Sequence, residues 1–140
     1  MEEGIFKFTL DETECQHEIK TPVCLCNATD DNQVYCDAIW DTGATHSMIA
    51  ENVAKKLMLR PIGRTTVAGV HGINSANCYL VTLKFGNDVQ LKDIRVSEAS
   101  NNGGFGLLVG MDIIGRGTLH IDGADDTLHV TFELPILKYA

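Results

Sequence analysis

The segment from Ala38 to Ala44, Ala-Ile-Trp-Asp-Thr-Gly-Ala, places a carboxylate directly after an apolar run. Asp41 in this position could accept backbone N–H bonds in a turn, ligate a metal, or serve as half of a catalytic pair of carboxylates. Gly43 permits a backbone conformation that other residues resist, so the pattern predicts a sharp turn where a strand leaves the core. These residues alone leave the three roles of Asp41 open.

The elements that must position Asp41 are mostly strands, because short runs of β-forming residues recur between turn signals. The expected strands are residues 5–10, 21–27, 33–40, 78–85, 89–96, 107–109, 118–121 and 127–133. Turns are expected at residues 27–32 and 86–88, and a flexible loop at 101–104, where Gly, Asn and Asp gather.

Helical spacing of apolar residues predicts one helix over residues 46–59, which Arg60-Pro61 ends. A second short helix is expected from Met111 to Ile114. With no internal repeat, 140 residues fit one domain, so we expect a single domain over residues 1–140.

The charge balance excludes some classes of partner. The chain has 11 Lys and Arg against 19 Asp and Glu, a net charge of -8, which argues against nucleic acid and anionic lipid. No apolar stretch is long enough to span a membrane and the N-terminus is acidic, so the sequence predicts a cytoplasmic protein.

The five cysteines are expected to be reduced thiols, because an odd number without an export signal argues against a disulfide framework. Cys15 with His17, and Cys24 with Cys26, share i, i+2 spacing, so a zinc-stabilised structural protein is one hypothesis. The spacing is shorter than structural zinc sites usually have, and small buried hydrophobic side chains are the favoured role. We therefore expect no metal or organic cofactor.

Two longer segments resemble the retropepsin-like aspartic proteases of retroviruses, retrotransposons and bacteria. AIWDTGATHSMIAENVAKKLML matches the segment in which an apolar strand leads into Asp-Thr-Gly-Ala and then a helix. FGLLVGMDIIGRGTLHI matches a second signature, with apolar Leu108 and Val109 before Gly110 and a short helix after it. Their order and separation also fit the family.

The resemblance implies a mostly β, retropepsin-like acid-protease fold with closed, barrel-like sheets, a flap hairpin and one or two short helices, assembled as a homodimer. It implies an N-terminal extension of about 15 residues relative to a minimal viral protease. The segment around Gly69, Val70, His71 and Gly72 is similar to the flap that closes over substrate. An ordinary surface hairpin is the alternative for it.

The site residues are carried over from the family. The resemblance makes Asp41 catalytic, gives Thr42 a hydroxyl bond across the dimer axis, and lets Gly43 leave room for substrate backbone. The substrate-binding residues are then expected to be Ala44, Thr45, Gly69, Val70, His71, Gly72, Leu108 and Val109. Leu108 and Val109 would line or support apolar subsites, so hydrophobic side chains are expected around the cleaved bond.

The absence of a repeat makes a second chain necessary. Peptide hydrolysis of this kind needs two carboxylates that share a proton, and the chain carries one Asp-Thr-Gly, since residues 122–127 do not repeat it. The sequence therefore predicts an aspartic endopeptidase built from two copies of Asp41, with a peptide or protein substrate. Such a pair titrates in two coupled steps, so activity should favour mildly acidic conditions.

The chain departs from the viral pattern at several positions. Acidic residues that follow the viral motif are replaced by Thr45 and His46, and Gly-Arg-Asn or Gly-Arg-Asp is replaced by Gly110-Met111-Asp112. His46 could tune the dyad or contact substrate, although a polar residue at the start of a helix is the favoured interpretation. A catalytically silent peptide-binding or dimerisation module with the same fold is the alternative function.

Overall fold

The fold is built from ten strands and two short helices in the part of the chain that the computed structural model describes. The described residues are 4–10, 18–69, 72–86, 89–100, 104–124 and 127–135. The strands are β1 (Gly4–Leu10), β2 (Ile19–Cys26), β3 (Gln33–Trp40), β4 (Met48–Ala50), β5 (Gly63–Gly69), β6 (Gly72–Phe85), β7 (Val89–Ala99), β8 (Leu107–Val109), β9 (Thr118–Asp122) and β10 (Leu128–Leu134). The helices are α1 (Glu51–Lys56) and α2 (Met111–Ile114).

Six of these strands form a closed barrel. The order is β2-β3-β8-β4-β7-β6, and β6 pairs back to β2 through Cys24↔Lys84, Leu25↔Leu83 and Cys26↔Thr82. Closure leaves the interior to side chains, and Leu25, Ile49, Leu83, Leu91 and Leu107 are fully buried there. This architecture confirms the predicted mostly β fold with barrel-like sheets and two short helices.

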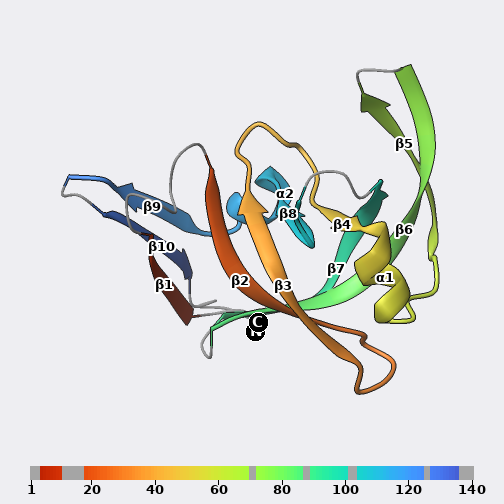
Figure 1. Cartoon of the computed structure of the whole chain (residues 1–140), viewed down its shortest axis with the longest axis horizontal. Helices are drawn as coiled ribbons and strands as arrows, with labels where there is room; N and C mark the ends of the chain where they lie inside the picture. Colours follow the sequence, from red (N-terminus) through yellow and green to blue (C-terminus); the bar gives the residue numbers. More distant parts are fainter. Residues whose placement is uncertain are drawn as a thin grey trace.

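Two additions extend from opposite sides of the barrel (Figure 1). Strand β5 pairs with the outer half of β6 to form a hairpin, with Gly69 opposite Gly72. On the other side β1, β10 and β9 form a separate three-stranded antiparallel sheet. Trp40 joins this sheet to the barrel, because its ring lies 5.1 Å from the rings of both Phe85 and Phe132.

The helix expected over residues 46–59 is shorter than predicted. Met48–Ala50 is instead strand β4, paired with both β7 and β8, and α1 ends at Lys56 before Met58 turns left-handed at φ 56°. The apolar spacing of this segment is compatible with either a helix or a strand. Residues 48–50 form a strand because they pair with two neighbouring strands. His46 therefore lies in a loop, not at the start of a helix.

The predicted turns can be compared with the structure where their residues are described. The β2–β3 hairpin turns over residues 27–32 as expected, with Asn27 N donating to Asn32 O at 3.1 Å. Gly86 has φ 60° at the β6–β7 turn and Gly104 has φ 70° in the loop before β8. The remainder of these two predictions, residues 87–88 and 101–103, lies outside the described residues. None of the helices in the described part of the chain has the length and apolar character to cross a lipid bilayer.

Candidate active site

Asp41 lies where β3 ends beside β8. These strands run in parallel with Trp40 opposite Val109, and the Asp41 N–H donates to the Val109 carbonyl at 2.9 Å. The two segments singled out in the sequence are therefore adjacent in space. The backbone of a buried sheet fixes the point from which the Asp41 side chain extends.

The Asp41 carboxylate is held on one side only by the residues that the structure describes. Its Oδ1 accepts the Gly43 N–H at 2.8 Å, while none of the described residues donates to Oδ2. Ala44 N also donates to the Asp41 carbonyl at 3.2 Å, which closes the turn. Asp41 is partly exposed, and no described residue occupies its second carboxylate oxygen.

The predicted backbone role of Gly43 is wrong, because its φ lies outside the left-handed region. The physical requirement is space. A Cβ at this position would lie 3.2 Å from Asp41 Oδ1, tighter than most real contacts. Gly43 therefore leaves room for the carboxylate that its own N–H holds.

A buried serine braces the loop after Gly43. Ser47 is fully buried, donates from Oγ to Asp112 Oδ1 at 2.7 Å, and donates from its backbone N–H to Asp112 Oδ2 at 3.0 Å. Its Oγ accepts the Gly110 N–H at 2.9 Å. Both oxygens of Asp112 are thus satisfied within a network that ties the loop to α2.

The loop and the segment before α2 cross with almost no space between them. Met111 N donates to Ala44 O at 2.8 Å and Asp112 N donates to Thr45 O at 3.2 Å. A Cβ on Gly110 would lie 2.9 Å from backbone atoms of both Ala44 and His46. Only glycine fits at this crossing, which explains the glycine of the second signature.

A cavity of about 350 Å³ opens between this loop and the hairpin. It is lined by Ala44, Thr45, His46, Met48, Thr65, Thr66 and Ser97. Two predicted substrate-binding residues, Ala44 and Thr45, are thereby brought together with Thr65 and Thr66 of β5. The lining combines polar side chains such as Thr65 and Ser97 with the apolar side chain of Met48.

The other predicted substrate-binding residues fall into three groups. Gly69 and Gly72 lie at the far end of the hairpin, while Val70 and His71 lie outside the described residues. Val109 is fully buried in the barrel. Leu108 is half-buried and pairs with Met48, which lines the cavity.

Several site residues were not predicted from the sequence. Met48, Thr65, Thr66 and Ser97 meet at the cavity only through strand pairing. Ser47 and Asp112 are 65 residues apart in the chain, and no sequence pattern connects them. Gly110-Met111-Asp112 was noted because it differs from the viral pattern, but the sequence did not show that Asp112 bonds to Ser47.

The described cysteines are free thiols. Cys24 and Cys26 have their Sγ atoms 3.9 Å apart, while Cys15 and His17 of the zinc hypothesis lie outside the described residues. Among the described residues, no group of three or more His, Cys, Asp or Glu side chains is arranged to hold a metal ion. Burial, with Asp37 and Cys24 nearby, raises the pKa of Cys36 to about 11.

Comparison with known families identifies the chain. Residues 27–113 match the family described as aspartyl protease, a span that includes Asp41, the hairpin and the Gly110 crossing. The chain belongs to the aspartyl protease family. A comparison with curated proteins finds no match.

Solved structures share the fold of the chain at low sequence identity. A retropepsin-like aspartic protease from Rickettsia conorii is similar with a TM-score of 0.63 and 16% identity, over 95% of this chain and 96% of that one. The EIAV protease in complex with the inhibitor HBY-793 is similar with a TM-score of 0.54 and 22% identity, over 72% of this chain and 88% of that one. The retroviral protease-like domain of Ddi1 from Leishmania major is similar with a TM-score of 0.54 and 20% identity, over 87% of this chain and 98% of that one. The fold is therefore retropepsin-like.

Proposed function

We propose that the protein is an aspartic endopeptidase that acts as a homodimer with one Asp41 from each chain. The observation that carries the proposal is the state of the Asp41 carboxylate. One oxygen accepts the Gly43 N–H and no described residue donates to the other, while Ala44 and Thr45 of the same loop line a cavity that faces the hairpin. Membership of the aspartyl protease family supports the same reaction class.

The chemistry requires a second carboxylate near the first. One carboxylate takes a proton from a water molecule while its protonated partner polarises the scissile carbonyl, so the pair shares one proton. Asp112 of α2 contacts the loop that follows Asp41, but both of its oxygens are bonded to Ser47. The chain carries one Asp-Thr-Gly motif, and a two-fold axis beside Asp41 would supply the second.

The three-stranded sheet supports assembly of two copies. Its outer strands β1 and β9 are edge strands in the described structure, and exposed strand edges pair readily with another chain. Ile5 on β1 is 43% exposed and Ile121 on β9 is 46% exposed. A second copy that pairs along one of these edges would cover apolar side chains as well as backbone groups.

The substrate is proposed to be an extended peptide in the cavity beside Ala44 and Thr45. Met48 and Leu108 provide apolar surface on one face of the β4–β8 pair, which favours hydrophobic side chains near the cleaved bond. Gly69, Val70, His71 and Gly72 are proposed to cover the peptide from the hairpin. Thr42 is proposed to contact its counterpart across the dimer axis.

The test is cleavage of a mixed peptide library between about pH 3 and pH 8 at several protein concentrations. Below the dimer dissociation constant, activity should rise more steeply than linearly with concentration, because only dimers carry two Asp41 side chains. Asp41→Asn should lower the rate by about 10²–10⁴-fold or more. Its amide oxygen still accepts the Gly43 N–H, so the circular dichroism spectrum and the sedimentation profile should match the wild type.

A matched control is Asp30→Asn. Asp30 Oδ1 accepts the Asn32 N–H at 2.8 Å, the same local bond that Asp41 makes to Gly43, in the β2–β3 turn, which does not line the candidate-site cavity. This variant should cleave at the wild-type rate. The proposal is wrong if Asp41→Asn retains activity, or if a folded wild-type dimer binds library peptides with no cleavage at any pH.

A further inference from the structure

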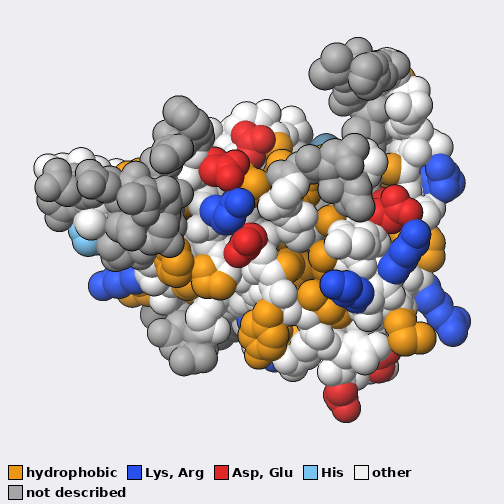
Figure 2. All heavy atoms as spheres, in the orientation of Figure 1, with side chains coloured by type: hydrophobic (Ala, Val, Ile, Leu, Met, Phe, Trp, Pro, Cys, Tyr) orange, Lys and Arg blue, Asp and Glu red, His pale blue; other side chains and the backbone are white. Residues whose placement is uncertain are grey.

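The β5–β6 hairpin is joined to the barrel by a chain of side-chain hydrogen bonds at its root. Arg64 of β5 lies opposite Asn77 of β6, where the hairpin meets the body of the molecule. Basic and acidic side chains lie close together on this face (Figure 2). The chain of bonds begins at Glu98, near the end of β7, and reaches β5 through Asn77.

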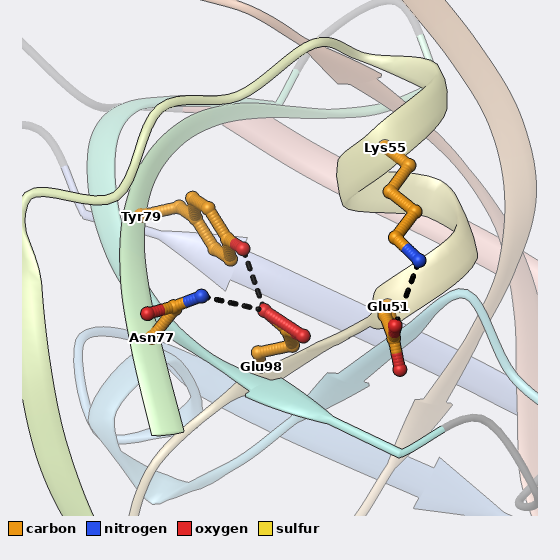
Figure 3. Close-up of polar contacts among 5 residues, drawn as sticks. All are labelled: Glu51, Lys55, Asn77, Tyr79 and Glu98. Atoms are coloured by element: carbon orange, nitrogen blue, oxygen red, sulfur yellow. Dashed lines mark hydrogen bonds and ion pairs between the residues drawn. The ribbon is translucent and has the colours of Figure 1, made fainter. Parts of the chain in front are cut away.

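Glu98 accepts two hydrogen bonds on one oxygen. Tyr79 Oη donates to Glu98 Oε2 at 2.6 Å and Asn77 Nδ2 donates to the same oxygen at 3.3 Å (Figure 3). Tyr79 lies within the barrel part of β6 and is 6% exposed, so it anchors Glu98 to the core. Glu98 therefore connects the rigid barrel to the first residues of the hairpin.

The side-chain amide of Asn77 connects Glu98 to Arg64. An amide donates from one side and accepts on the other, so an Asn77 whose NH₂ group points to Glu98 presents its oxygen away from it. Arg64 Nη1 donates to that oxygen at 2.8 Å, and Arg64 Nη2 donates to Ser75 Oγ at 2.8 Å. The position of Glu98 thus orients side chains on both strands of the hairpin.

The charged groups around Glu98 define its surroundings. Glu51 of α1 pairs with Lys55 one turn later at 2.8 Å and points to the same region (Figure 3). Burial, and then the hydrogen bond to Glu98, raise the pKa of Tyr79 above its ordinary value of 10.0, so the phenol remains a donor. Glu51, Glu98, Arg64 and Asn77 line a cavity of about 400 Å³.

This second cavity shares a wall with the candidate active site. Met48 lines both cavities, and Ser97 on the candidate-site side is the immediate neighbour of Glu98. Thr65 and Thr66, which line the candidate-site cavity, directly follow Arg64. A small displacement of Arg64 would therefore move two residues that line the candidate-site cavity.

We propose that Glu98 is a positioning residue that sets the placement of the β5–β6 hairpin over the substrate cavity by holding Asn77 toward Arg64. Its effect on catalysis rests on the proposed protease function. Its effect on the hairpin does not, because the bonds lie within one chain. The two can therefore be tested separately.

The primary test is amide hydrogen exchange in the full chain, with wild type compared to Glu98→Ala. We expect exchange in β5 and the outer half of β6 to rise by roughly three- to tenfold, the effect of losing one or two hydrogen bonds, with β2 and β3 unchanged. Glu98→Gln should restore wild-type exchange, since its amide oxygen can accept both bonds. The matched control is Glu51→Ala, which removes a carboxylate from the same cavity without breaking the chain of bonds.

Asn77→Ala provides a second, independent test if Glu98→Ala fails to fold. It breaks the connection to Arg64 but leaves the bond between Tyr79 and Glu98. Increased exchange confined to the hairpin supports the proposal. Wild-type exchange in Asn77→Ala, or an equal increase in Glu51→Ala, overturns it.

Kinetics and spectroscopy then separate positioning from general destabilisation. If the protein cleaves peptides, Glu98→Ala should raise KM about threefold or more with kcat little changed, because the chemistry at Asp41 is untouched. The ultraviolet titration of Tyr79 should shift to lower pH in Glu98→Ala. A protein that cleaves nothing refutes the proposed function, while the exchange data still decide the role of Glu98.

Discussion

The loop after Asp41 and the root of the hairpin are both held by short polar networks, yet these networks differ in kind. Ser47 and Asp112 are linked to backbone N–H groups in a buried crossing, with Ser47 fully buried. Arg64 and Asn77 interact mainly side chain to side chain at an exposed surface. Buried networks penalise the loss of any member, whereas exposed ones exchange their partners for water. Loss of a bond should therefore cost more stability in the loop than at the hairpin root.

Gly110→Ala should have the largest effect on stability. Its Cβ would meet backbone atoms of Ala44 and His46 at 2.9 Å, and backbone cannot move aside as a side chain can. We expect a loss of about 3 kcal/mol in the free energy of unfolding, measured in urea, the upper end for overpacking. Gly63→Ala at the hairpin root is the matched control, because a Cβ there meets nothing within 4 Å. Equal losses in both variants would contradict the contrast between the regions.

Ser47→Ala should have the next largest effect. The substitution removes the hydroxyl that donates to Asp112 and accepts from the Gly110 N–H, so two buried groups lose a partner. The expected cost is about 1–3 kcal/mol in the free energy of unfolding. Urea unfolding followed by circular dichroism measures it, and Ser100→Ala at an exposed position controls for the change of residue type.

Arg64→Ala should have the smallest effect on global stability. It removes contacts to Asn77 and to both the hydroxyl and the carbonyl of Ser75, more bonds than Ser47 loses. Because Arg64 is exposed, we expect the free energy of unfolding to change by no more than about 0.5 kcal/mol. The same urea titration measures this change. A loss of stability as large as that of Ser47→Ala would contradict the difference between the buried and the exposed network.

Much of the fold could be predicted because its strands carry strong local signals. β3 and β8 have the predicted bounds, since both are apolar runs that end at turn residues. The position of Asp41 at the end of a buried strand was predictable for the same reason. The family signatures also placed Asp41 and Gly110 in one site, where β3 and β8 are now found side by side.

The rest depends on contacts that no local pattern encodes. Met48–Ala50 becomes a strand only because β7 and β8 pair with it. Asp112 gives no sign in the sequence that its partner is Ser47, and Glu98 gives none that it contacts Tyr79 and Asn77. The backbone requirement predicted at Gly43 was wrong, because the sequence alone could not show that a Cβ there would crowd Asp41 Oδ1.

The parallel pairing of β3 with β8 determines when during synthesis the site can form. Ser47 can bond to Asp112 only after 65 more residues have been synthesised. At about 5–20 residues per second, this takes the ribosome several seconds. Pairings this distant in sequence also form slowly after synthesis. A nascent chain thus carries its Asp-Thr-Gly motif before Asp112 can fix the loop that follows it. A growing polypeptide therefore lacks a complete site for its proposed activity until β8 and α2 have been made.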